Sequence, residues 1–145
     1  MKKRLLLLVF PAVALVLELL PKGVMMQFAV PPGEPPIIEY HPYFSLFPFG
    51  YGNFAPFPTA LITLIVFITL AVYCKNGNYN LINLSRGFLC VGVLFSVIPF
   101  VLFGIKTLTL VGALITLSLA AGLFVLLFVK KSTETQKHTD RKSVV

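Results

Sequence analysis

The sequence predicts an all-α membrane protein: a four-transmembrane-helix bundle with a Pro- and aromatic-rich external loop between helices 1 and 2. Hydrophobic residues make up 57% of the 145 residues and charged residues only 12%, about half the share of roughly 25% that is usual in soluble domains. The apolar residues gather in four runs that approach or exceed the ~18 residues that suggest a membrane helix. These runs lack the alternation of barrel strands, and an open sheet cannot satisfy its backbone in lipid.

The four runs divide the chain into the elements of a single membrane domain, residues 1–145. About 20 helical residues are needed to cross ~30 Å of hydrocarbon, so the first and third runs are short and can extend into 22–29 and 83–87. The predicted elements are helix 1 at 5–20, the external loop at 21–56, helix 2 at 57–74, a cytoplasmic loop at 75–87, helix 3 at 88–103, an external turn at 104–107, helix 4 at 108–129 and a cytoplasmic tail at 130–145.

The first run has two interpretations, because basic residues before an apolar stretch also begin a secretory signal. No small-residue cleavage site follows the run, and Glu18, Pro21 and Lys22 occupy the region where it would lie. We therefore expect a retained helix.

The basic residues predict the orientation of the helices. In a four-span chain, ten of the 12 Lys and Arg lie on one side and only Lys22 and Lys106 on the other. Positive charge is enriched in cytoplasmic loops, so both termini should be cytoplasmic. The net charge of +7 is thus a topology signal, and we predict contact with the lipid bilayer and none with nucleic acid.

Nine of the 11 prolines lie in or beside the external loop, at positions 21–58. Proline is disfavoured in helix interiors and central strands, so an irregular loop is expected. Its second half is rich in aromatic rings that need an apolar partner, and we expect it to cap the outer rim of the bundle. The predicted cap residues are Phe44, Phe47, Phe49, Gly50, Gly52 and Phe54.

The string Phe49–Gly52, FGYG, shares Gly-Tyr-Gly with the potassium-channel filter. Such a filter also needs a preceding pore helix and a Thr-Val pair directly before the Gly-Tyr-Gly. Here Pro48 and Phe49 occupy the positions of the Thr and the Val. The two glycines are therefore interpreted as turn residues that let the aromatic half of the loop turn and re-enter the membrane.

Glu18 is the sharpest candidate for a functional residue, because an ionisable group at membrane depth is costly. Its spacing from Pro11 and Ala14 puts all three on one helix face, which should point into the bundle. One hypothesis makes Glu18 a proton or cation carrier. The other makes it structural, bonded to Lys106, Thr59, Thr63 or a loop amide. A membrane Glu in the first of four helices is similar to the small multidrug resistance family, but that family has a short first loop and the likeness ends there.

Small and hydroxylic residues form stripes on helices 3 and 4, which let helices approach closely in lipid. A permeation path is the alternative interpretation of these stripes. The predicted helix-packing residues are Gly92, Ser96, Gly112, Thr116 and Ala120.

No arrangement of residues predicts catalysis, a metal site or a cofactor. Cys74 and Cys90 fall near the cytoplasmic face and should stay reduced, and His41 is a lone histidine beside Glu39. No nucleophile–base constellation can be assembled on one membrane face. We therefore expect a non-enzymatic accessory or scaffold protein, bound to other membrane proteins or to itself. The alternative is a small proton-coupled transporter or pore that uses Glu18.

Three strings taken together resemble an uncharacterised family of small four-helix integral membrane proteins of low-GC Gram-positive bacteria. They are LELLPKG at 17–23, QFAVPPGEP at 27–35 and YFSLFPFGYGNFAPFPTALIT at 43–63. The resemblance covers about the first half of the chain, and Lys22 departs from it. It implies this topology and a bacterial inner membrane, and it carries no activity.

Overall fold

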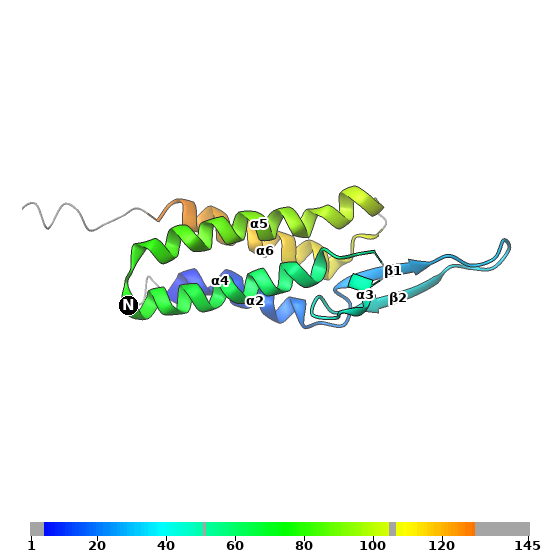
Figure 1. Ribbon diagram of the computed structural model, residues 1–145, viewed down its shortest axis with the longest axis horizontal. Helices are drawn as coiled ribbons and strands as arrows, with labels where there is room; N and C mark the ends of the chain where they lie inside the picture. The colour runs from blue at the N-terminus through cyan, green and yellow to red at the C-terminus, as the bar shows by residue number, and fades with distance from the viewer. Residues whose placement is uncertain (1–4, 51, 105–106, 130–145) are drawn as a thin grey trace, which may run out of the picture.

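The computed structural model describes residues 5–50, 52–104 and 107–129, which form a helical bundle with a small strand pair at one end (Figure 1). The prediction of a mostly helical chain with long apolar helices is confirmed. The described elements are η1 Leu6–Leu8, α2 Val9–Glu18, β1 Val24–Phe28, β2 Ile37–His41, α3 Phe47–Gly50, α4 Pro56–Asn76, α5 Tyr79–Phe103 and α6 Leu110–Leu127.

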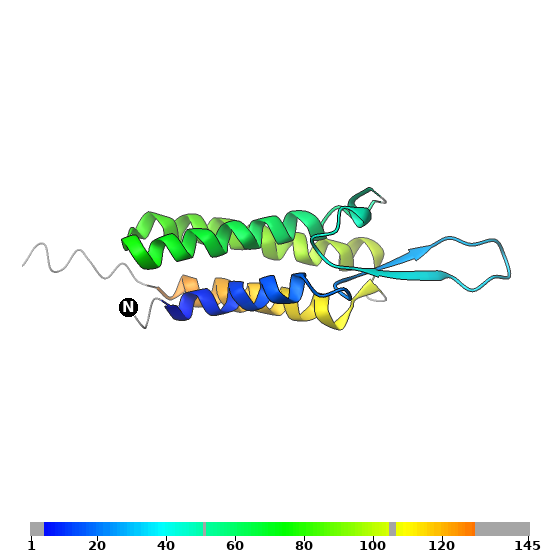
Figure 2. The ribbon, with the colours of Figure 1, turned by 90° about the horizontal axis from the view of Figure 1, so that it is seen from below.

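The four main helices run alternately up and down. Each packs against two neighbours, α2 against α4 and α6, and α5 against α4 and α6. Seen from below, α2 and α6 form one pair and α4 and α5 the other (Figure 2). The strands, α3 and the connection between α5 and α6 therefore share one end of the bundle, called the hairpin end below. The connection between α4 and α5 lies at the opposite end.

Three of the described helices, α4, α5 and α6, are long and apolar enough to cross a membrane, which indicates a membrane protein. The first helix is shorter, with 10 residues in α2 and 3 in the preceding η1 turn. At about 1.5 to 2 Å per residue this covers roughly 20 Å of a ~30 Å hydrocarbon core.

Helix α5 begins at Tyr79, within the segment predicted as a cytoplasmic loop at 75–87. The break between α4 and α5 consists of Gly77, which has a left-handed φ of 68°, and Asn78, whose side chain accepts a bond from the Asn80 amide. Gly at the end of one helix and Asn at the start of the next are strong capping residues. The loop prediction was wrong because the Asn-rich stretch after Asn78 is helical, with Asn80 and Asn83 exposed and Ile82 and Ser85 buried.

One stripe of each helix is buried, and glycines allow close approach. A Cβ added at Gly92 would lie 3.2 Å from the Ile62 side chain, and one at Gly122 would lie 3.2 Å from Phe10 Cβ. Gly92, Ser96 and Gly112 are buried as predicted, but Thr116 is only half-buried and Ala120 is exposed. Of the stripe predicted on the last helix, only Gly112 therefore belongs to the buried face. The buried face of α6 comprises Gly112, Ile115, Leu119, Gly122 and Leu126.

Arg86 closes the end of the bundle opposite the hairpin. Its guanidinium donates to the carbonyl of Leu126 at 2.7 and 3.0 Å, to that of Val129 at 2.8 Å and to Asn83 Oδ1 at 2.9 Å. The first two acceptors are at the C-terminus of α6, where unpaired carbonyls carry partial negative charge. Arg86 is thus a cap for the C-terminus of α6.

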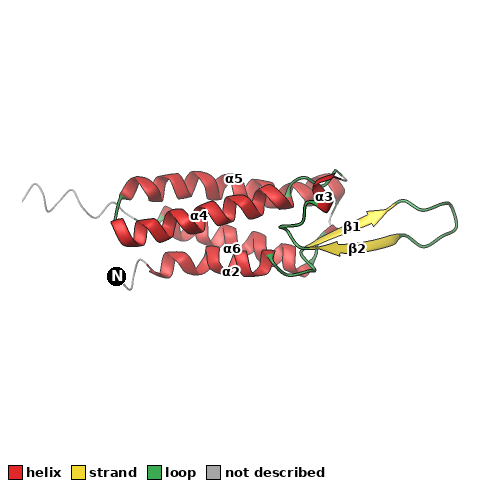
Figure 3. Cartoon of the chain, turned by 60° about the horizontal axis from the view of Figure 1, so that its bottom comes forward, coloured by secondary structure: helices red, strands yellow, loops and turns green. Residues whose placement is uncertain are grey.

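The predicted irregular loop contains an antiparallel β-hairpin (Figure 3). Strand β1 pairs with β2 in the register Val24 with His41 through Phe28 with Ile37. The prediction failed because the prolines lie outside the ladder: four fall between the strands, at 31, 32, 35 and 36, and one follows β2, at 42. Proline is compatible with a hairpin when no ladder amide is needed from it.

Candidate functional site

Glu18 is the last residue of α2 and lies inside the bundle at its hairpin end. Its side chain is 0% exposed, and its Oε1 accepts a hydrogen bond of 2.7 Å from the Thr63 hydroxyl of α4. Pro11, Ala14 and Glu18 are the buried residues of α2, which is the face that their spacing predicts. One of the structural partners expected from the sequence, Thr63, is therefore the observed one.

The second carboxyl oxygen of Glu18, Oε2, is buried and has no hydrogen-bond partner among the described residues. Lys106, the preferred partner from the sequence, lies outside the described residues. The hydroxyl of Thr63 also lies 2.9 Å from the carbonyl of Thr59, so two acceptors share one proton. This carboxyl group is consequently only partly satisfied, which is expensive in an apolar interior.

Tyr43 joins this buried group to the hairpin. Its amide donates to the main-chain carbonyl of Glu18 at 3.0 Å, and its side chain is only 3% exposed. Burial, with a smaller contribution from the Glu18 carboxylate, raises the pKa of the Tyr43 phenol above its ordinary value. The phenol therefore stays protonated and neutral at physiological pH.

Gly23, before β1, and Tyr43, after β2, join the hairpin to the bundle and are called its roots below. The Gly23 root is hydrogen-bonded to the N-cap residue of α6. The hydroxyl of Thr109 donates to the carbonyl of Gly23 at 2.6 Å and accepts from the Gly112 amide at 2.9 Å. Thr109 is thus the N-cap of α6 and also binds the residue before β1. This pair of hydrogen bonds is called the Thr109 clasp below. A Cβ at Gly23 would lie 2.8 Å from the Tyr43 ring, so the two roots also pack on each other.

The aromatic strip, residues 43–57, is covered by the bundle only in part. The buried members are Tyr43, Pro48, Ala55 and Pro56, and Phe44 is half-buried against the core. Phe47, Phe49 and Phe54, which were predicted to cap the outer rim, are 41%, 49% and 41% exposed, so these three residues are only partly covered. The short α3 turns Pro48 inward and Phe47 and Phe49 outward, and the exposed rings make edge contacts with neighbouring rings, such as those of Phe49 with Phe57 and of Phe54 with Phe95.

The two glycines of the FGYG string have different roles. Gly50 is the last residue of α3, and Gly52 has a φ of 93°, which favours glycine. Gly52 therefore serves as the turn residue that the sequence indicates. Tyr51 lies outside the described residues.

The hairpin is anchored at its base and exposed along its length. Val24 and Met26 of β1 are buried in the core, whereas Ile37, Ile38 and Tyr40 of β2 are 54%, 47% and 48% exposed. The strand pair extends away from the helices (Figures 1 and 2). It contains Glu34 and Glu39 and no Lys or Arg between 24 and 41, so its exposed surface is apolar and acidic.

Comparison of the chain with models of protein families, with curated proteins and with solved structures finds no match. The resemblance to small Gram-positive membrane proteins therefore stays a prediction.

Sequence reasoning identified Glu18 but missed the residues that hold the hairpin. Thr109, Gly23 and Tyr43 are separated along the chain and meet only in the fold. One signal was present: Thr109 precedes an apolar helix, as an N-cap should. The pairing of its hydroxyl with a carbonyl 86 residues away has no local sequence signature.

Proposed function

We propose that this protein is a non-enzymatic accessory or scaffold subunit of a bacterial inner membrane, which docks another membrane protein through its external hairpin. In this proposal η1 and α2 act as a short first span, so the chain crosses four times with both termini in the cytoplasm. The single observation that carries the proposal is an exposed apolar hairpin whose two ends are hydrogen-bonded to the bundle.

The base supports docking because binding to a preorganised element costs less ordering entropy than binding to a mobile one. Gly23 is held by Thr109 at one root and Tyr43 by Glu18 at the other. A loop with no binding role gains nothing from presenting Ile37, Ile38 and Tyr40 to its surroundings, and exposed apolar patches mark interaction sites.

The chemistry of the hairpin indicates the kind of partner. A two-stranded sheet leaves one edge of each described strand without a neighbouring strand, and such an edge accepts an extended segment by main-chain pairing. Glu34 and Glu39 favour a segment that carries Lys or Arg. We therefore infer an extended, basic and partly apolar extracytoplasmic segment of another membrane protein.

The test is site-specific photo-crosslinking in cells that express the protein. A photoreactive residue at Ile38 or Tyr40 should give one discrete crosslinked product, and the same residue at Leu94, which is exposed in the middle of α5, should not. A product containing two copies of this chain would replace the hetero-partner by self-association. The absence of a discrete product at both hairpin positions would refute docking through the hairpin.

One observation favours the alternative, a proton-coupled transporter. Glu18 Oε2 has no hydrogen-bond partner among the described residues. Transport also requires a water-filled path to this carboxyl group, and its side chain is fully enclosed. Proteoliposomes loaded with a pH-sensitive dye distinguish the two functions. Proton flux that is lost in Glu18→Gln, while the fold persists, would support transport over docking.

A further inference from the structure

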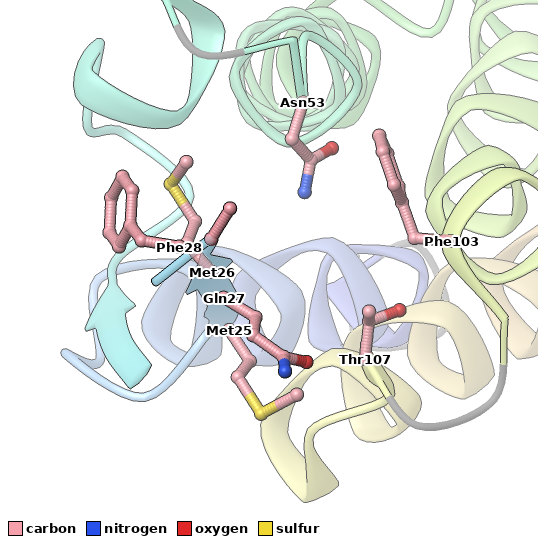
Figure 4. Close-up of a pocket in the computed structure, with 8 residues that line it drawn as sticks. Met25, Met26, Gln27, Phe28, Asn53, Phe103 and Thr107 are labelled. Atoms are coloured by element: carbon pink, nitrogen blue, oxygen red, sulfur yellow. The ribbon is translucent and has the colours of Figure 1, made fainter. Parts of the chain in front are cut away.

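A pocket of about 390 Å³ opens at the base of the hairpin, between β1 and the outer ends of the helices (Figure 4). This volume is within the range of small-molecule sites, about 300–1,000 Å³. Its walls are mostly apolar and come from strand β1 and from the last residue of α5. The apolar lining residues are Met25, Met26, Phe28, Ala29 and Phe103.

Three neutral polar side chains complete the lining. Asn53 reaches into the pocket from the segment before α4, opposite Gln27 of β1 and Thr107 near the start of α6 (Figure 4). No charged side chain is present among the described lining residues. The pocket therefore fits an apolar chain that carries uncharged hydrogen-bonding groups, such as an ester-linked acyl chain.

The pocket adjoins a surface that suits lipid. Val101, Leu102 and Phe103 end α5, and the side chain of Val101 is 76% exposed. Phe103 belongs both to this run and to the pocket wall. An acyl chain of the surrounding bilayer can thus reach the pocket without crossing water.

A second hollow of about 400 Å³ shares Met25 with the first. It is lined by Lys22 and Tyr40 together with apolar residues at the start of α6, Leu108 and Leu110 among them. Lys22 is exposed, and in the four-span orientation proposed above, on which this inference rests, its positive charge lies at the level of the lipid headgroups. The two hollows offer an apolar pocket and a cationic site on either side of one methionine.

We propose that the base of the hairpin binds one anionic phospholipid of the outer leaflet. Its acyl chain enters the pocket between Met26 and Phe103, its ester group meets Asn53, and its phosphate lies beside Lys22. The bound lipid fills the space between β1 and the helix ends and so supports the hairpin from below.

The test uses the full chain in vesicles of phosphatidylcholine and phosphatidylglycerol, with a phosphatidylglycerol probe that carries a diazirine on its acyl chain. After irradiation, peptide mapping should show adducts enriched on residues 25–29 and on Phe103. Ala29→Trp adds bulk at an exposed lining position and should reduce these adducts at least about fivefold. Val101→Trp adds the same side chain to the lipid-facing run outside the pocket and should leave them unchanged.

The headgroup is tested with a matched phosphatidylcholine probe. A basic residue near the membrane surface is worth about a fivefold preference for an anionic lipid, so Lys22→Gln should abolish the preference for phosphatidylglycerol. Adducts spread evenly over the exposed helix faces, or insensitive to Ala29→Trp, would overturn the proposal. Equal labelling by both probes in the wild-type protein would overturn the anionic headgroup.

Discussion

Replacing Thr63 by Val should destabilise the bundle through Glu18. The Thr63 hydroxyl is the donor to Glu18 Oε1 at 2.7 Å, and Oε2 already lacks a described partner. Hydrogen bonds to charged groups contribute about 1.5–3 kcal/mol in soluble proteins, and interhelical bonds in membranes average about 0.6 with a maximum of about 1.7 kcal/mol. We expect a loss of about 1–2 kcal/mol, which lowers the ratio of folded to unfolded protein by about 5- to 30-fold.

The assay is reversible unfolding in mixed micelles with increasing dodecyl sulfate, read by circular dichroism. The matched control is Thr69→Val, because the Thr69 hydroxyl bonds only to the carbonyl of Ile65 on its own helix. In a Glu18→Leu background, Thr63→Val should cost less than about 0.5 kcal/mol, since no buried carboxyl group is left unpaired. Equal costs in both backgrounds, or a cost no greater than that of Thr69→Val, would contradict this account of Glu18.

Three further outcomes are expected. Arg86→Met removes the cap on α6 and should cost about 1–2 kcal/mol, with faster amide exchange in the last turn of α6 but not in its middle; unchanged exchange would show that the cap is dispensable. Gly23→Ala drives a methyl group into the buried tyrosine ring at 2.8 Å and should destabilise by about 1–3 kcal/mol, whereas Gly87→Ala, with open space around it, should be neutral or slightly stabilising. An impermeant maleimide applied to intact cells should label a cysteine placed at Gly33 and not one at Asn78, and labelling at Asn78 would refute the proposed orientation.

The sequence could predict the long helices because one physical requirement controls them. A membrane-length helix needs an unbroken apolar run. Such a run can be recognised in the sequence without knowing which segments the helix packs against. The inward face of the first helix was also predictable, since the spacing of Pro11, Ala14 and Glu18 is a local property. Partners of Glu18 could only be narrowed to several candidates, because the sequence does not reveal how the helices are rotated against one another.

The hairpin and the start of α5 were missed for a related reason. The proline count of the external segment was averaged over its length, although the prolines leave Val24–Phe28 and Ile37–His41 clear. In the same way, the Asn-rich stretch after Gly77 was assigned by composition rather than by position. Gly77 as the C-cap of α4 and Asn78 as the N-cap of α5 indicated the correct helix boundaries.

The stability of the bundle and the presentation of the hairpin are linked through the same residues. The main-chain carbonyl of Glu18 holds the Tyr43 amide at 3.0 Å, while the Glu18 side chain holds α4 through Thr63. A substitution that shifts the end of α2 must therefore shift the root of β2. The Thr109 clasp fixes the root of β1 to α6 in the same manner. Because both strands leave the bundle from clasped roots that pack on each other, the direction of the hairpin is set by how the four helices meet. A partner bound to the hairpin would accordingly favour one packing of the helices, and by linkage the same packing would favour the partner.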